Sequence, residues 1–145
     1  FQADEPGVYY GQCAEYCGTS HANMRLRVQA LPREEFDAWV AERQAREAFV
    51  TSDDLVARGR DIFLNSACAA CHTVDGTAAA GTVGPNLSDI GSRTTIAAGI
   101  LDNTPENMAA WLRDPQAVKP GTLMPNLNLS NDQVSALVAF LSALD

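Results

Sequence analysis

Two cysteines and a histidine lie close together near the middle of the chain, in the order Cys-Ala-Ala-Cys-His at residues 68–72. Two thiols three positions apart on one helical turn can each add to a vinyl group of a haem, and the adjacent imidazole then lies under the iron. A zinc site or a thioredoxin-like pair also uses such cysteines, but no alternating strand–helix pattern surrounds them. The spacing therefore predicts covalent haem attachment through Cys68 and Cys71, with His72 as the proximal ligand.

An iron that only passes electrons needs a second axial ligand, and the one other histidine, His21, lies far upstream. A methionine is therefore the expected donor. Met108 lies in a helical apolar stripe, which favours core packing, and Met24 lies far upstream, in the segment 1–31 that also holds His21. Met124 lies in a Pro- and Gly-rich loop, residues 119–125, which can close over the haem face opposite the proximal histidine. We expect Met124 to be the second ligand.

A second group of soft ligands lies near the start of the chain. Two thiolates four positions apart, an imidazole and a thioether form a donor set that suits copper. Two such cysteines on one loop can bridge a pair of copper ions, while the histidine and the methionine each cap one metal. A disulfide or unused thiols are the alternative explanation. The residues are Cys13, Cys17, His21 and Met24.

The chain of 145 residues has 46% hydrophobic and 19% charged residues, which is enough apolar material for one modest core. Its formal net charge of −8 argues against nucleic acid and favours partners with positive patches, unless the charge only supports solubility. No run approaches the ~18 apolar residues of a membrane span. There is no signal segment, and Phe1 is not a methionine, so we expect a mature product or a piece of something longer.

The sequence divides into three segments. Residues 1–31 alternate like two short strands around the loop that carries the soft ligands, residues 13–24, which we call the copper-type loop. Such a pair of strands cannot bury a core alone, so we expect the truncated edge of another domain. Residues 32–51 are predicted to be a connecting helix, over 33–49, with a linker. Residues 52–145 are predicted to be a complete, mainly helical domain, with an irregular loop over 73–103.

Three helices of this last segment have recognisable ends. Thr51 with Asp54 is a predicted capping pair for the first helix, which should end just before residue 68. Thr104 precedes a proline at the start of the second helix, and Ser130 with Gln133 caps the third. The predicted apolar faces consist of Leu55, Gly59, Ile62 and Phe63; Met108, Trp111 and Leu112; and Val134, Leu137, Val138, Leu141 and Leu144.

From about residue 53 to residue 144 the chain resembles class I cytochromes c, which are mainly α-helical and fold around a covalent haem. The matching motifs are Gly-Arg-Asp-Ile-Phe at 59–63, Cys-Ala-Ala-Cys-His at 68–72, Gly-Pro-Asn-Leu at 84–87, Gly-Ser-Arg at 91–93, Trp-Leu at 111–112 and Met-Pro at 124–125. The resemblance implies that the Pro85 carbonyl accepts a hydrogen bond from the second nitrogen of His72.

The same resemblance implies two further placements. Gly59 should let the first and last helices of the domain cross closely, with Phe63 and Phe140 at the crossing. Arg93 and Trp111 should lie near the haem propionates, although plain core packing would also explain the tryptophan.

The stretch around the copper-type loop resembles the binuclear copper A loop in subunit II of haem–copper oxidases. Residues 26–28 followed by 36–39 also resemble the end of that subunit's cupredoxin domain, which implies that residues 1–31 are the truncated C-terminal edge of a copper A cupredoxin domain. The resemblance implies bridging ligands at Cys13 and Cys17, a backbone carbonyl ligand at Glu15, and terminal ligands at His21 and Met24. That family's site needs one more histidine from an earlier strand, and here the only other histidine is the proximal haem ligand. We therefore expect no binuclear copper in this chain as it stands.

A copper A loop followed by a cytochrome c domain is similar to the C-terminal part of subunit II of caa-type, proton-pumping cytochrome c oxidases. The resemblance implies electron flow from an external donor, a small cytochrome or an iron–sulfur protein, through the haem to copper A and then to subunit I. It implies copper A only in the full subunit, membrane attachment only through upstream helices, and a location in the periplasm or on the outer face of the bacterial membrane.

Two alternatives remain. A nitrous oxide reductase with a fused cytochrome domain also has a copper A loop, although Glu15 and Gly18 fit the oxidase loop better. A haem peroxidase or gas sensor would need an iron with an open sixth position, against which the loop around Met124 argues.

Overall fold

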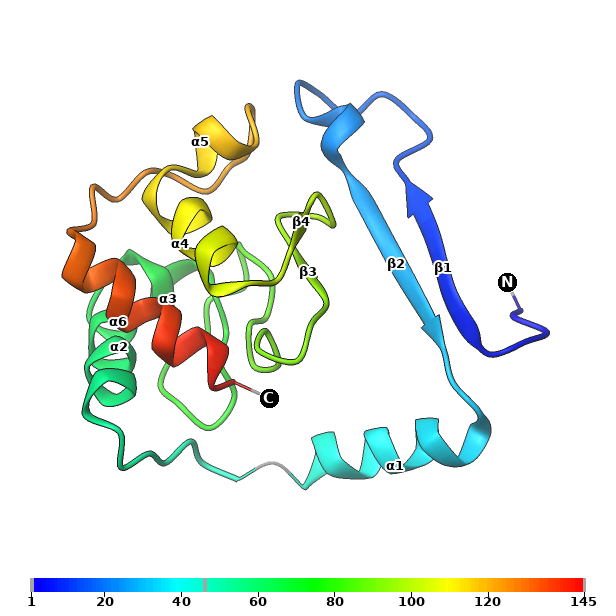
Figure 1. The fold of residues 1–145 in the computed structure, drawn as a ribbon, viewed down its shortest axis with the longest axis horizontal. Coiled ribbons are helices and arrows are strands. Elements are labelled where there is room, and N and C mark those ends of the chain that lie inside the picture. Colours follow the sequence, from blue (N-terminus) through cyan, green and yellow to red (C-terminus); the bar gives the residue numbers. More distant parts are fainter. Residues whose placement is uncertain (1, 46, 145) are drawn as a thin grey trace.

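The computed structural model describes residues 2–45 and 47–144, which form a β-hairpin, a connecting helix and a helical domain (Figure 1). Phe1, Arg46 and Asp145, which belong to the three predicted segments, lie outside the described residues. The elements are β1 (Gly7–Gln12), the short 3-10 helix η1 (His21–Asn23), β2 (Arg25–Ala30), α1 (Arg33–Gln44), α2 (Asp54–Leu64), α3 (Ala67–Cys71), β3 (Thr95–Ile96), β4 (Leu101–Asp102), α4 (Pro105–Arg113), α5 (Pro115–Val118) and α6 (Asn131–Ser142).

The two predicted strands are present and pair with each other. β1 and β2 run antiparallel, in a register that aligns Gly7 with Ala30 and Gln12 with Arg25. None of the described residues of either strand is buried, and the Tyr10 side chain is 76% exposed. The hairpin therefore has the exposed apolar faces that an isolated pair of strands must have.

The connecting helix is shorter than predicted. α1 ends at Gln44, and Glu47 to Phe49 are not helical, so the prediction of helix up to residue 49 is wrong. The ring of Phe49 meets that of Phe140 edge-on, with 5.4 Å between centroids, so this stretch leads the chain onto the helical domain. Burial of an aromatic ring outweighs the helix propensity of the residues around it.

None of the described helices is long and apolar enough to cross a membrane.

The helical domain is organised around the crossing of α2 and α6 (Figure 1). Phe63 and Phe140 are 2% and 0% exposed, and their ring centroids lie 5.6 Å apart. The helices approach closely at Gly59, as expected: a Cβ there would lie 2.0 Å from the Ala136 carbonyl oxygen. A hydrogen at this position is therefore a requirement of the fold.

Gly59→Ala should destabilise the haem-loaded chain by about 2–3 kcal/mol or more, because the new methyl group meets backbone that cannot move aside as a side chain can. The measurement is the free energy of unfolding in guanidinium chloride. Gly7→Ala is the matched control, because a Cβ at Gly7 meets only the Tyr9 ring at 3.9 Å. Equal stability losses in the two variants would contradict the predicted crossing.

The cap of α2 differs from the prediction. Asp53, and not Thr51, caps the helix, because its carboxylate accepts hydrogen bonds from the Leu55 and Val56 amides at 2.8 and 3.0 Å. The Thr51 hydroxyl instead accepts from the Asp53 amide. Leu55 is 43% exposed, so its predicted place on the buried face is wrong. Val56 packs on the core in its place, three residues before Gly59.

The other two predicted helix starts are confirmed. Thr104 caps α4 through the Asn107 amide, and Ser130 and Gln133 form a capping box on α6. β3 and β4 are two-residue strands within the region predicted to be irregular, and are too short to show a period in the sequence. The buried side chains of the domain core include Met108, Leu112, Val134, Leu137, Leu141 and Leu144.

Candidate functional site

A cavity of about 560 Å³ lies inside the helical domain, a volume typical of sites that enclose a small ligand or cofactor. Its wall brings together the four predicted haem-binding side chains. The apolar part of the wall comes mainly from the loop before α4 and from α4 itself. The residues concerned are Cys68, Cys71, His72 and Met124, with Leu87, Ile90, Ile96, Met108, Trp111 and Leu112.

The haem-attachment motif lies on a single helical turn. Ser66 caps α3 by accepting from the Cys68 amide, and the His72 amide donates to the Cys68 carbonyl at 2.9 Å. Cys68 is buried and Cys71 is half-buried. The turn thus presents both thiols and the imidazole to one cavity, as thioether attachment requires.

The His72 ring is oriented by its surroundings. Its Nδ1 lies 2.8 Å from the Pro85 carbonyl oxygen, which can only accept, so Nδ1 carries the proton and donates. That tautomer leaves Nε2 to bind iron, and the hydrogen bond increases its donor strength. A Cβ at Gly84 would lie 2.5 Å from Cε1 of the ring, so only glycine lets the loop pass there. The residues present fit a proximal haem ligand.

Arg93 and Trp111 both line the cavity, as expected for groups near the propionates. The Arg93 guanidinium donates to the Asn86 carbonyl at 2.8 Å and forms an ion pair with Asp89 at 2.9 Å. These contacts fix the loop that ends in Ile90, next to the cavity. A propionate role for Arg93 and Trp111 remains a prediction.

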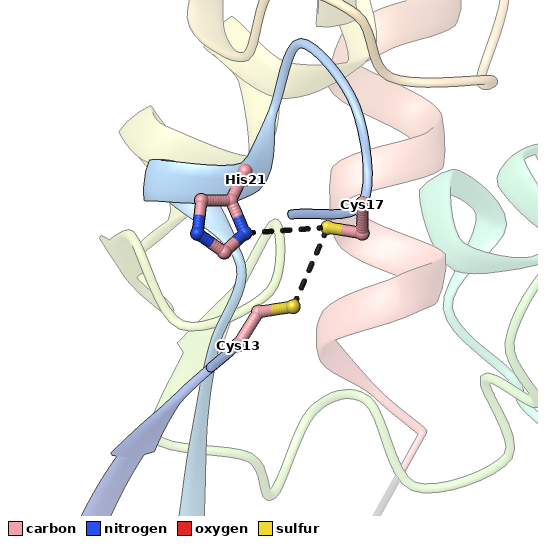
Figure 2. Close-up of side chains that lie close together, drawn as sticks. All are labelled: Cys13, Cys17 and His21. Atoms are coloured by element: carbon pink, nitrogen blue, oxygen red, sulfur yellow. Dashed lines mark hydrogen bonds between the residues drawn. The ribbon is translucent and has the colours of Figure 1, made fainter. Parts of the chain in front are cut away.

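The copper-type loop lies between β1 and β2, and Figure 2 shows the side chains of Cys13, Cys17 and His21 close together in it. Sγ of Cys13 lies 3.4 Å from Sγ of Cys17 and 3.0 Å from the backbone carbonyl oxygen of Glu15. Sγ of Cys17 lies 3.7 Å both from Nδ1 of His21 and from Sδ of Met24. All five residues predicted from the resemblance thus converge on one exposed loop. The two thiols, the imidazole and the thioether are four soft or borderline donors, a set that suits copper.

The thiol of Cys17 is less acidic than an ordinary cysteine thiol, because its pKa is raised. Its hydrogen bond with Cys13 is the largest cause and raises the pKa of Cys17 above its ordinary value, while the positive charge of Lys119 acts in the opposite direction. Metal binding must therefore displace a proton that the loop retains at neutral pH.

The copper-type loop and the start of β2 touch two loops that line the cavity. The Ser20 hydroxyl donates to the Pro120 carbonyl, and the Arg25 amide donates to the Ala98 carbonyl at 3.0 Å. A Cβ at Gly121 would lie 2.6 Å from Cβ of Thr19. The hairpin therefore packs against the mouth of the cavity, and Figure 1 shows its loop end beside α5.

Several cavity residues were not anticipated from the sequence. Ala97, Ala98 and Gly99 line the cavity with positive φ angles of 54°, 59° and 76°, and Lys119 lines it at 8% exposure. The glycine after two small residues was a usable signal for a turn. A lysine in a Pro- and Gly-rich loop is normally predicted to lie on the surface, so nothing in the sequence indicated the burial of Lys119.

The helical fold, the cavity and the Cys–Cys–His turn define a c-type, covalently haem-binding protein. Residues 56–145 match the family model described as cytochrome c, and the chain belongs to this family. Residues 1–31 match a second model, described as the periplasmic domain of cytochrome c oxidase subunit II. Two independent family models thus meet in one chain, on either side of α1.

Curated relatives span the same junction. Cytochrome c oxidase subunit 2 of Alkalihalophilus pseudofirmus is 44% identical over 99% of this chain, and that of Bacillus sp. (strain PS3) is 45% identical over 95%. The chain covers 41% and 40% of the length of these relatives. Among solved structures, the c-type cytochrome SorU of Sinorhizobium meliloti is 28% identical, with a TM-score of 0.46 over 63% of this chain and 91% of that one.

Proposed function

We propose that this chain is the C-terminal part of subunit II of a caa-type haem–copper oxidase, and that it carries electrons one at a time. The haem held by His72 and Met124 accepts an electron from an external donor, a small cytochrome or an iron–sulfur protein. The electron then passes to copper A on the hairpin of the complete subunit and on to subunit I. The oxidase relatives and the haem motif support an extracytoplasmic location.

The contact between the hairpin and the loops that line the haem cavity is the observation that carries this proposal. Ser20 and Arg25, which flank or follow the copper ligands, bond to loops that line the haem cavity. A route between the metals can therefore run within one chain. The protein supplies the position and the polarity of both centres, and the redox chemistry belongs to the cofactors when bound.

The test uses the complete subunit loaded with haem and copper. After flash reduction of the haem, its reoxidation by copper should proceed at a rate independent of protein concentration. In a variant with Cys13→Ser and Cys17→Ser, the haem should stay reduced on the same timescale. A rate that rises with concentration would show transfer between molecules and would contradict the proposal. Binding of carbon monoxide to the ferrous haem would instead favour the peroxidase or sensor alternative.

The chain as it stands should not form binuclear copper A. It contains two histidines, and His72 lies in the haem cavity, so the loop lacks the second imidazole that the resemblance requires. Titration of the haem-loaded chain with copper should give no purple copper–thiolate absorption beyond the haem spectrum. Mixed-valence signals in electron paramagnetic resonance would contradict this expectation, and the complete subunit is the positive control.

A further inference from the structure

The segment that carries Met124 is a loop with little regular structure of its own. Between α5 and Met124, a turn bond joins the Thr122 amide to the Lys119 carbonyl at 3.1 Å. A loop that supplies an axial ligand must nevertheless keep its backbone within a fraction of an ångström of the productive position. The contacts that hold this loop therefore matter for the haem.

The side chain of Gln116 makes three hydrogen bonds to this loop. Its Nε2 donates to the carbonyls of Thr122 and Met124, at 2.5 and 3.4 Å, and its Oε1 accepts from the Gly121 amide at 3.2 Å. One primary amide thus uses both of its donors and its acceptor on the backbone of one short loop. One of the three partners is the carbonyl of Met124 itself.

Gln116 is itself held in place. It lies in α5, whose start is fixed by Pro115 and by the Asp114 carboxylate, which accepts from the Gln116 and Ala117 amides, each at 3.1 Å. The side chain of Pro115 is buried. The amide therefore extends from a capped turn with a buried proline toward the loop that carries Met124.

We infer that Gln116 is a positioning residue for the axial ligand, which it serves by fixing the backbone from which the Met124 thioether reaches the iron. This inference rests on the proposed role of Met124 in the haem site. Loss of the three bonds lets the loop move away from the iron more often, so an added ligand competes more easily for the sixth position.

The described residues of the hairpin contact only the start of the same loop, whereas Gln116 reaches both its start and Met124. Ser20 bonds to the Pro120 carbonyl, and Thr19 lies against Gly121. Neither contact reaches the carbonyl of Met124. Ser20→Ala therefore separates support by the hairpin from support by Gln116.

The experiment compares the ferric, haem-loaded chain with its Gln116→Ala and Gln116→Glu variants. The far-red band of Met sulfur-to-iron charge transfer should weaken in both, because neither alanine nor a carboxylate can donate to the two carbonyls. Imidazole should bind about tenfold more tightly, which corresponds to about 1.4 kcal/mol. Gln44→Ala, at an exposed position at the end of α1, is the matched control and should behave like the unchanged chain.

An unchanged far-red band and an unchanged imidazole affinity in Gln116→Ala would overturn the inference. It would also be overturned if the single variant Ser20→Ala showed the weakened band and the tighter imidazole binding in full. If Gln116→Ala does not fold, Gln116→Glu decides the matter, because it keeps the size of the side chain and an acceptor for Gly121. Absence of the far-red band from the unchanged chain is a different result: it would contradict the axial role of Met124, and with it the proposed electron carrier.

Discussion

A chain with Cys68→Ser and Cys71→Ser is expected to contain no covalently bound haem and to lose most of its folded stability. The two thiols are the groups that can add to the haem vinyl groups, and a serine hydroxyl does not replace them. Without the haem, the cavity of about 560 Å³ leaves apolar walls without a partner in the middle of the domain. We expect the free energy of unfolding to fall by more than about 4 kcal/mol, beyond the usual range for substitutions.

The measurements are haem-dependent peroxidase staining after denaturing electrophoresis, which detects only covalent haem, and unfolding followed by circular dichroism. Cys13→Ser with Cys17→Ser is the matched control, because it makes the same chemical change in the other cysteine pair. This control should retain its haem. Covalent haem in the first variant, or its loss from the control, would reverse the assignment of the two pairs.

Helix starts in the helical domain could be predicted where a capping residue lies next to the helix in the sequence. Thr104 and Ser130 cap their helices as predicted, because a hydroxyl just before a helix can accept a hydrogen bond from a free amide of its first turn whatever surrounds it. The position of Asp53 shows the limit of such rules. Thr51 and Asp53 both have capping side chains, and a local rule does not choose between them; in the structure Asp53 caps the helix and Val56 packs on the core.

The composition of each site was also available from the sequence, whereas the contact between the sites was not. Cys68, Cys71 and His72 adjoin in the chain, so one turn of helix brings them together. The bond from Ser20 to Pro120 joins residues a hundred positions apart, and no periodicity or motif encodes such a pair. Long-range contacts depend on how completed elements pack, which local patterns do not determine.

Met124→Ala is expected to abolish the far-red band of the ferric chain and to lower the haem potential. A thioether ligand favours ferrous iron, so its loss stabilises the ferric form. We expect a fall on the order of 0.1 V, within the ~0.8 V range over which axial ligands set haem potentials. The ferrous variant should also bind carbon monoxide, because its sixth position is open. Spectroelectrochemical titration and carbon monoxide difference spectra measure these effects.

Met108→Leu is the matched control, because it removes the other methionine thioether that lines the cavity. Met108 lines the same cavity, but it is 3% exposed on the buried face of α4, where a thioether fills space in the core. Leucine has a similar volume, so this variant should keep the far-red band and nearly the same potential. The opposite pattern, with the band lost in Met108→Leu and kept in Met124→Ala, would place the axial ligand on α4. The loop held by Gln116 would then have no iron ligand to position.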